Sequence, residues 1–345
     1  MGSSKDKART DELWSAVSSD ILHLTLLPTE ACNFRCVYCY ESFKLGKMPD
    51  KVIAGVKNHL KRRIAELKTL QISWFGGEPL LALDVIENIG GYVQTLLTST
   101  PLVAYHSDIT TNAYFLVPDI FDRLCKLGVR KFQISFDGVK TDHDRRRIQA
   151  NGGPTFDRIW GNLVEMQHSP VNFSALVRLH LDSENVENIP RFIEQFRGQF
   201  GGDARFRLFI RPISKLGGPN DTTLPVLGPS EAVSASNRFA TDCDNVGIPS
   251  KTLSQGADVP ICYASKLNAW VIRSDGRINK CTVAFDSATN DVGHLSPDGS
   301  FALNPDRLKP WIRGLDSKDA GELGCPLVQF PAFNEFVAKD VAKAT

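Results

Sequence analysis

The chain lacks several features that would place it in a membrane, outside the cell or on nucleic acid. Nowhere in its 345 residues is there a run of about 18 apolar residues, the length that a membrane-spanning helix needs. The first twenty residues are polar and contain no apolar signal core. Lys and Arg number 40 and Asp and Glu 39, so no basic excess attracts nucleic acid. We therefore expect neither membrane nor nucleic-acid partners.

The composition that remains suits a large folded unit with redox chemistry. Apolar residues make up 42% of the chain, enough to bury a core, and the length suits a large domain with an appendage. Eight cysteines without a secretory signal favour metal or redox chemistry over disulfides. Oxygen-sensitive metal clusters need a reducing compartment, so we expect a cytoplasmic protein.

Strand-like and helix-like segments alternate along most of the chain. Apolar runs predict strands at 21–27, 70–75, 103–110, 131–136, 174–181 and 205–210. Helical patterns fall at about 50–67, 83–97, 118–127, 156–167 and 187–199. Six such alternations predict a parallel sheet with right-handed crossovers, an α/β fold. A stretch rich in Gly and Pro at 214–230 predicts a loop and a domain junction near residue 235.

Three cysteines follow the first expected strand with the spacing C-x3-C-x2-C: Cys32, Cys36 and Cys39. Three thiolates on one loop can hold three irons of a cubane iron–sulfur cluster, because sulfur ligands select such clusters. With no fourth cysteine nearby, one iron would stay open to bind a substrate or cofactor. A zinc knuckle or ordinary buried thiols are the alternatives, but zinc sites usually carry a second C-x2-C pair and none follows.

This motif, with Tyr38 between its last two cysteines, resembles that of the radical S-adenosylmethionine (SAM) superfamily. The resemblance covers nearly the whole chain. It implies a partial, TIM-like (β/α)6 barrel with its site at the carboxyl ends of the strands. It also implies a [4Fe-4S] cluster that binds SAM and cleaves it to a 5′-deoxyadenosyl radical, with a reductant such as flavodoxin or ferredoxin.

Gly76, Gly77 and Glu78 directly follow the second expected strand. Two glycines let the backbone turn sharply and approach a ligand, and a carboxylate can accept hydrogen bonds from an ammonium group. The segment resembles the family's Gly-Gly-Glu motif, which implies that its backbone and carboxylate bind the SAM amino group. A plain turn is the alternative.

A second pair of segments resembles family motifs at the next strand ends. Thr110-Thr111-Asn112 resembles the T-T-N-G segment, with Ala113 in place of glycine, and a turn or cap is an equal alternative. Ser135 resembles a serine that contacts SAM, and Arg147, twelve residues on, an arginine that pairs with the SAM carboxylate.

For the charged residues around Arg147, the sequence suggests simpler structural roles. We expect Arg145 and Arg146 to belong to a solvated run of charges, and Asp137 is a candidate helix cap. Arg178 lies inside an apolar strand and so needs a partner, either a cofactor carboxylate or Asp182. His180 lies on the same face of that strand, and we expect it to be an ordinary core histidine.

The C-terminal cysteines form a second group. Cys262 and Cys281 carry the pattern C-x13-G-x4-C across two short expected strands joined by a turn at 274–276. The pattern resembles the start of a SPASM or twitch domain, which holds auxiliary clusters. A full SPASM domain has a further C-x2-C-x5-C group, whereas this chain has only Cys325. The resemblance implies one auxiliary iron–sulfur cluster, of [4Fe-4S] type, on Cys262, Cys281 and Cys325. The fourth ligand would be Cys243, or the site would stay open, and reduced structural thiols are the alternative.

The expected organisation is a polar tail at 1–20, a radical SAM barrel at 21–235 and an α+β twitch or SPASM-like domain at 236–345. Similarity to peptide-modifying SPASM enzymes implies an oxidoreductase or maturase that installs an oxidative cross-link or related change in a ribosomal precursor peptide. With no room for a peptide-recognition domain before residue 21, a separate recognition protein or direct docking would be needed.

Two alternatives accompany this expectation. A twitch-type dehydrogenase or cyclase acting on a small molecule is the second candidate. A non-catalytic iron–sulfur protein would lack the Gly-Gly-Glu motif. Formylglycine formation is disfavoured, because Thr282 stands where sulfatase maturases carry an aspartate base.

Overall fold

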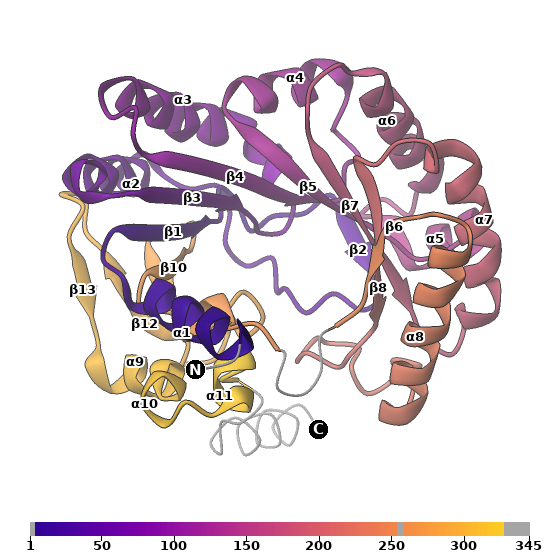
Figure 1. Ribbon diagram of the computed structural model, residues 1–345. Helices are drawn as coiled ribbons and strands as arrows, with labels where there is room; N and C mark the ends of the chain where they lie inside the picture. The colour runs from indigo at the N-terminus through magenta and orange to yellow at the C-terminus, as the bar shows by residue number, and fades with distance from the viewer. Residues whose placement is uncertain (1–3, 254–258, 328–345) are drawn as a thin grey trace.

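The computed structural model describes residues 4–253 and 259–327, in which strands curve into a partial barrel with helices on its outer face (Figure 1). Eleven strands of these residues form one sheet in the order β13-β12-β11-β10-β1-β3-β4-β5-β7-β8-β9, and two short strands form a separate sheet. The six central strands of the larger sheet are β1 (Ile21–Leu26), β3 (Thr69–Trp74), β4 (Ala104–Thr111), β5 (Val129–Phe136), β7 (Ser174–Leu181) and β8 (Phe206–Pro212). They pair in parallel, which confirms the expected fold and strand series.

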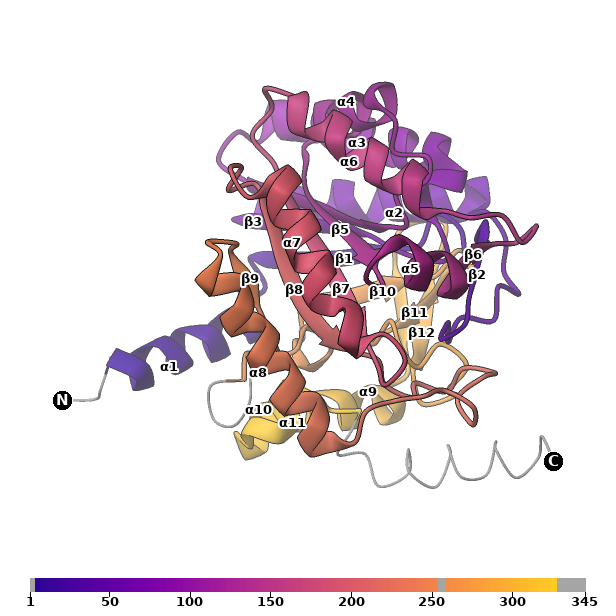
Figure 2. The same ribbon diagram turned by 90° about the vertical axis from the view of Figure 1, so that its right-hand side faces the viewer.

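Five outer helices follow the expected ranges closely: α2 (Asp50–Arg63), α3 (Leu83–Ser99), α4 (Pro118–Lys126), α6 (Phe156–His168) and α7 (Ile189–Phe200). A sixth, α8 (Pro229–Asn245), was not expected from the sequence. Short 3-10 turns lie at η1 (Ile64–Glu66), η2 (Pro79–Ala82) and η3 (Val186–Asn188). Figure 2 shows α7 and α8 over the end of the sheet that contains β7 and β8. Among the described residues, no helix has both the length and the apolar character needed to cross a membrane.

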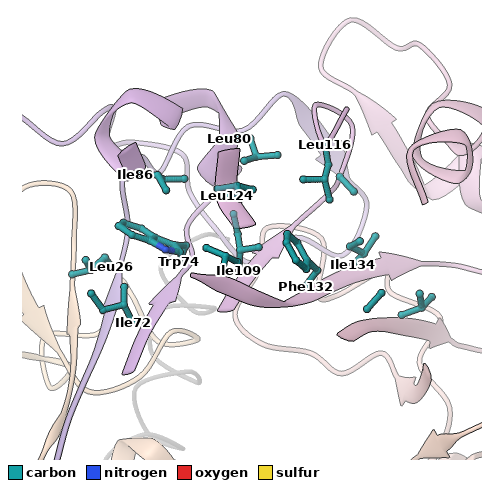
Figure 3. Close-up of a cluster of buried hydrophobic side chains, with 14 of the residues drawn as sticks. Leu26, Ile72, Trp74, Leu80, Ile86, Ile109, Leu116, Leu124, Phe132 and Ile134 are labelled. Atoms are coloured by element: carbon teal, nitrogen blue, oxygen red, sulfur yellow. The ribbon is translucent and has the colours of Figure 1, made fainter. Parts of the chain in front are cut away.

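Alternation along the strands separates an apolar outer face from a polar inner face. In β3, Ile72 and Trp74 are buried against the helices, while Gln71 and Ser73 lie on the opposite face. Figure 3 shows the outer core, where strand residues such as Ile109 meet helix residues. The inner face is therefore free to carry polar chemistry.

The C-terminal segment extends the barrel sheet. Strand β10 (Ala269–Ile272) pairs in parallel with β1, and β11 (Arg277–Asn279) returns antiparallel around Gly276, which has a φ of +92°. The hairpin was expected, but its parallel pairing with β1 was not. The remaining elements are β12 (Asp291–Leu295), β13 (Phe301–Leu303), η5 (Tyr263–Ser265), α9 (Pro305–Ile312), α10 (Gly314–Ser317) and α11 (Ala320–Gly324).

Both expected boundaries differ from the structure. Residue 235 lies inside α8, and β9 (Ser250–Lys251) still pairs with β8, so the barrel layer continues to about residue 251. Residues 4–17 form helix α1 (Ser4–Val17) in place of the expected tail. Leu13 and Ala16, one turn apart, pack with Ile261 and Leu323 of the C-terminal segment. Residues 328–345 of the expected auxiliary domain lie outside the described part.

Candidate active site

A small second sheet fixes the cysteine loop at the carboxyl end of β1. Strand β2 (Phe34–Cys36) pairs antiparallel with β6 (Arg147–Gln149), which follows helix α5 (Lys140–Arg146). The register places Cys36 opposite Arg147. Two residues that the sequence assigned to cluster and cofactor are therefore neighbours through backbone pairing, which their separation in the chain had concealed.

One cavity gathers most of the expected site residues. The thiols of Cys32, Cys36 and Cys39 line it together with eight of the nine residues assigned to SAM: Tyr38, Gly76, Gly77, Thr111, Asn112, Ser135, Arg147 and Arg178. They come from the carboxyl-terminal halves of parallel strands or from the segments that follow those strands. The ninth, Glu78, lies directly beneath and is fully buried.

The donor set fits an iron–sulfur cluster. All eight cysteines are free thiols. Burial is the main cause that raises the pKa of Cys39 to about 12, and the charges of Glu41 and Cys36 add to it. Burial raises the pKa of Cys32 as well, with contributions from Glu78 and the other two cysteines. In the described ranges, no three Cys, His, Asp or Glu side chains are arranged to share a single metal ion. Three thiols gathered at one cavity suit a cluster in which each thiolate ligates its own iron.

The two glycines of the Gly-Gly-Glu motif are required by close packing under the cysteine loop. Gly76 has a φ of +117°, and a Cβ there would lie 2.2 Å from the carbonyl oxygen of Thr29. A Cβ on Gly77 would lie 2.5 Å from the carbonyl oxygen of Ala31. Any side chain at either position would push the cysteine loop away from β3.

Glu78 has three hydrogen-bond donors inside the protein. Its Oε1 accepts from the backbone N–H of Leu80 (3.0 Å) and from Oγ1 of Thr111 (2.7 Å), and its Oε2 accepts from the N–H of Asn112 (2.7 Å). Burial raises the pKa of Glu78, and these bonds oppose the rise. The carboxylate thus ties the end of β3 to the end of β4, a structural role that the motif alone did not indicate.

The segment after β4 joins this network. Asn112 donates from Nδ2 to Oδ1 of Asn33, in the cysteine loop, over 2.8 Å. Ala113 has a φ of +61°, the left-handed conformation that favours glycine. The family motif carries glycine at this position, so the backbone geometry of the motif is kept here despite the substitution.

Tyr38 is held by hydrogen bonds from two directions. Its hydroxyl donates to Oδ1 of Asp137 over 2.7 Å and accepts from Nη1 of Arg147 over 2.7 Å. Nδ1 of His180 lies 3.0 Å from the same hydroxyl. Burial would raise the pKa of Asp137, but His180 and the arginines beside it more than offset this and hold the pKa below its usual range. Asp137 therefore does not serve as a helix cap.

The expectation for Arg146 was wrong. Its side chain is almost fully buried, donates from Nε to Oδ2 of Asp137 over 3.2 Å and pairs with Asp182. Arg145 is half exposed, as expected. A run of three arginines does not show which one turns inward, and helix α5 places Arg146 there. Because Asp182 pairs with Arg146, it is not the partner of Arg178.

The second group of cysteines does not line the cavity but lies close to two residues that do, Tyr40 and Arg211. Cys262 precedes η5, Cys281 follows β11 and Cys325 follows α11. Burial and the charges of Cys262 and Cys325 raise the pKa of Cys281, to about 12, so these three thiols are near one another. Tyr40 lines the cavity and is close enough to both Cys39 and Cys281 for each to raise its pKa, after burial and Glu41.

Cys243 is placed elsewhere. It is buried in α8, where burial, Asp242 and Asp244 raise its pKa to about 12 and Ser250 of β9 hydrogen-bonds to it. No other cysteine is among the groups that shift its pKa. Its position offers no support for the fourth-ligand assignment, because a shared cluster would bring it among the other three.

A buried ion pair that sequence reasoning missed joins the two halves of the site. Arg273, at the end of β10, donates from Nε to Oε1 of Glu30 over 3.0 Å and from Nη1 to the carbonyl of Phe285 over 2.8 Å. Glu30 lies two residues before Cys32. The pair thus fixes the C-terminal hairpin against the cysteine loop.

Comparisons with known proteins agree with this arrangement. Residues 26–196 match the family model described as Radical SAM superfamily. The chain is 33% identical over 176 residues to an uncharacterised protein of Methanocaldococcus jannaschii, covering 50% of this chain and 56% of the relative. It is 24% identical over 166 residues to PqqA peptide cyclase of Granulibacter bethesdensis, covering 48% and 41%. It is 26% identical over 185 residues to a probable GTP 3′,8-cyclase of Methanopyrus kandleri, covering 52% and 54%. The chain thus spans about half of the length of these curated relatives.

Solved structures share the fold. Native anSMEcpe with bound AdoMet and Kp18Cys peptide aligns with a TM-score of 0.64 at 18% identity, covering 85% of this chain and 84% of that one. Streptococcus suis SuiB bound to S-adenosylmethionine aligns with a TM-score of 0.60 at 15% identity, covering 91% and 72%. At these identities the likeness establishes the barrel architecture.

Proposed function

We propose that this chain, which belongs to the radical SAM superfamily, cleaves SAM reductively and removes a hydrogen atom from a ribosomal precursor peptide, which is then oxidised by cross-linking or a related change. The observation that carries the proposal is that the first cysteine group lines a cavity with Tyr40, and that Tyr40 is close enough to both Cys39 and Cys281 for each thiol to raise its pKa.

The first group would hold the radical-generating cofactor. Bound there, a [4Fe-4S] cluster with SAM supplies one electron and a 5′-deoxyadenosyl radical that abstracts hydrogen. Cys32, Cys36 and Cys39 would ligate three irons. Ser135 and Arg147 lie on the cavity wall where they can bind the SAM carboxylate, since a guanidinium offers a fork of donors that matches a carboxylate.

The second group supports an oxidative outcome. Net oxidation of a substrate radical requires one electron to leave, and Cys262, Cys281 and Cys325 would ligate an auxiliary iron–sulfur cluster suited to accept it. The hydroxyls of Thr282 and Tyr263 lie 2.8 Å apart, and Thr282 offers no carboxylate base. This agrees with an oxidation other than formylglycine formation.

Two sets of similar proteins bear on the substrate class. A relative named as a peptide cyclase and a solved neighbour with a bound peptide favour a peptide. The relatives named as GTP 3′,8-cyclases favour the second candidate, a small molecule. A peptide substrate would reach the cavity by direct docking or through a separate recognition protein, with flavodoxin or ferredoxin as reductant.

One experiment tests the chemistry and then the substrate. The protein is reconstituted anaerobically, and 5′-deoxyadenosine is measured with dithionite and SAM. The variant in which Cys32, Cys36 and Cys39 become Ala should lose one cluster's iron and form no 5′-deoxyadenosine, while Cys125→Ala, a buried core thiol, should keep both. Equal product in the triple variant would refute the assignment. Precursor peptides encoded beside the gene are then compared with nucleotides and sugars by mass spectrometry, where a peptide that loses two hydrogens supports the leading proposal.

A further inference from the structure

Two arginines share one wall of the cavity. Arg178 lies on β7 and Arg211 on β8, and the parallel register pairs His180 with Arg211, so Arg178 lies one inward-facing position before it. Both side chains line the same cavity as the three cysteines of the first group. Their neighbours on the outer face, Leu179 and Ile210, are fully buried in the core. The two guanidinium groups therefore face inward from adjacent strands.

Neither arginine has a partner in the part of the chain that the structure describes. No hydrogen bond or ion pair involves Arg178 or Arg211, and the Nε of Arg178 is buried without an acceptor. Two other interior arginines are paired with carboxylates, Arg146 with two aspartates and Arg273 with Glu30. Arg147 donates to the hydroxyl of Tyr38, and its Nε is also buried without an acceptor. Burying a cation without a neighbouring anion costs free energy. Two adjacent arginines without an ion pair therefore indicate a binding site for an external anion.

The nearby carboxylates do not fill this role. Asp137 is held by Tyr38 and Arg146, and Glu78 by three internal donors. Glu41 lines the same cavity, but the positive charge that lowers its pKa is that of Arg273. Among the described residues, no carboxylate therefore forms an ion pair with either arginine, although the charge of Asp137 acts on Arg178 from a greater distance.

The position of Arg178 and Arg211 favours a role in binding substrate over a role in binding the cofactor. Arg211 is close to Tyr40 and to Cys325 of the second cysteine group, and Arg178 is close to Tyr40 and Tyr38. They therefore lie between the two groups of cysteines. Arg147, which pairs across β2 and β6 with Cys36, stands on the side of the first group and is placed to serve the cofactor.

We propose that Arg178 and Arg211 together bind an anionic group of the substrate, a carboxylate or a phosphate, and hold the substrate between the two cysteine groups. This inference rests on the proposed function for its reaction, and it restricts the substrate class to anionic molecules: a peptide with an acidic side chain near its reacting residue, or a phosphorylated small molecule. Two guanidinium forks on adjacent strands suit either group.

The test measures binding of two simple probes, glutarate for a carboxylate and inorganic phosphate for a phosphate, by calorimetry. The protein is reconstituted and saturated with SAM, and chloride at equal ionic strength serves as the reference. One probe should bind to the wild type at one site. Binding should weaken at least about tenfold in Arg178→Gln and in Arg211→Gln, the loss expected for a charge-assisted hydrogen bond. The probe that binds identifies the group.

A matched control is available on the same strand. Arg207 lies four residues before Arg211 on the same face of β8 but is exposed and lines a different cavity, with Lys131 and Lys251. Arg207→Gln should leave probe binding within twofold of the wild type. Arg178→Lys and Arg211→Lys keep the charge and should restore part of the affinity, which a merely structural loss would not allow.

Each contrary result overturns the proposal. If neither probe binds the wild type, the pair is not an anion site. An equal loss in Arg207→Gln means diffuse electrostatics, and a fall in SAM affinity in Arg178→Gln, measured without probe, makes Arg178 a cofactor ligand. A changed midpoint potential of the auxiliary cluster in Arg211→Gln with unchanged probe binding assigns Arg211 to that cluster.

If the glutamine variants do not fold, the wild-type titration and the lysine variants decide. Probe binding requires no SAM cleavage, so its failure is separate from a wild type that forms no 5′-deoxyadenosine.

Discussion

The phenol of Tyr38, which lies between Cys36 and Cys39 in the chain, donates a 2.7 Å hydrogen bond to Asp137, the residue that follows β5. The cysteine loop leaves β1 and has no regular structure of its own apart from β2. This bond, with the one from Arg147, ties the loop to the far side of the cavity mouth. The position of the cysteines therefore depends on the barrel strands as well as on their own spacing.

Tyr38→Phe should lower the free energy of unfolding of the cluster-free protein by about 1–3 kcal/mol, the cost of leaving buried polar partners unsatisfied. Arg147 and Asp137 would lose the hydroxyl between them. Denaturant unfolding measures the change. Tyr114→Phe is the control, because the phenol of Tyr114 makes no hydrogen bond in the described residues. Equal stability of Tyr38→Phe and the wild type would show that the network does not hold the loop.

Glu78→Gln should act on the fold and on SAM. A glutamine has one acceptor oxygen, so its amide N–H₂ would face a donor, either the N–H of Asn112 or the pair from Leu80 and Thr111. We expect a loss of about 1–3 kcal/mol in unfolding free energy without SAM, and SAM binding weaker by about 1.5–3 kcal/mol. Calorimetry after reconstitution gives the second value.

Glu66→Gln, at an exposed helix end, should change neither quantity. Weaker SAM binding with unchanged stability would assign Glu78 to the cofactor alone. Unchanged SAM affinity with lost stability would leave only the structural role that its three hydrogen bonds indicate.

The sequence predicted what local patterns encode. Apolar runs predicted the six central strands, and eight of the nine residues that the sequence assigned to SAM line one cavity. Contacts between distant segments were missed. Glu30 and Arg273 are 243 residues apart, and neither lies in a recognisable motif. Helix α1 shows too few apolar residues to indicate that Leu13 and Ala16 pack on the C-terminal segment.

His23 makes stability depend on pH. Burial, together with the charges of Lys266 and Lys280, lowers the pKa of His23 from 6.5 to about 4, and its Nε2 lies 2.9 Å from Oγ of Ser73. Between pH 4 and pH 6.5, His23 binds a proton in the unfolded chain but not in the folded one. The contribution of His23 to the free energy of unfolding is therefore full above pH 6.5 and falls as the pH approaches 4.

His23→Gln should reduce the slope of unfolding free energy against pH in this window by at most about 1.4 kcal/mol per pH unit, the value for one proton. Part of the slope should remain, because burial also lowers the pKa of His180, to about 4. Denaturant unfolding at a series of pH values measures it. His168→Gln should leave the slope unchanged, since His168 is mostly exposed, and an unaltered slope in His23→Gln would contradict the buried neutral imidazole.

The second cysteine group can be separated from the first by iron content and products. Replacing Cys262, Cys281 and Cys325 by Ala should remove about one cluster's worth of iron, because these thiolates would be its ligands. Cys243→Ala is the matched control and should keep all the iron, since Cys243 lies in α8 beside β9. Iron lost in that control would restore it as the fourth ligand.

The products of the same variants decide what the second group does. The triple variant should still form 5′-deoxyadenosine, because the first group keeps its own three ligands, whereas modified substrate should fall much further, since the electron on the substrate radical would have no acceptor. A metal site can contribute folding free energy directly, so solubility and far-ultraviolet circular dichroism are measured before the products. Unchanged iron would mean that the three cysteines are not ligands. Lost iron with full yield of modified substrate would mean that a cluster binds there but does not accept the electron, and the oxidative mechanism would then be wrong.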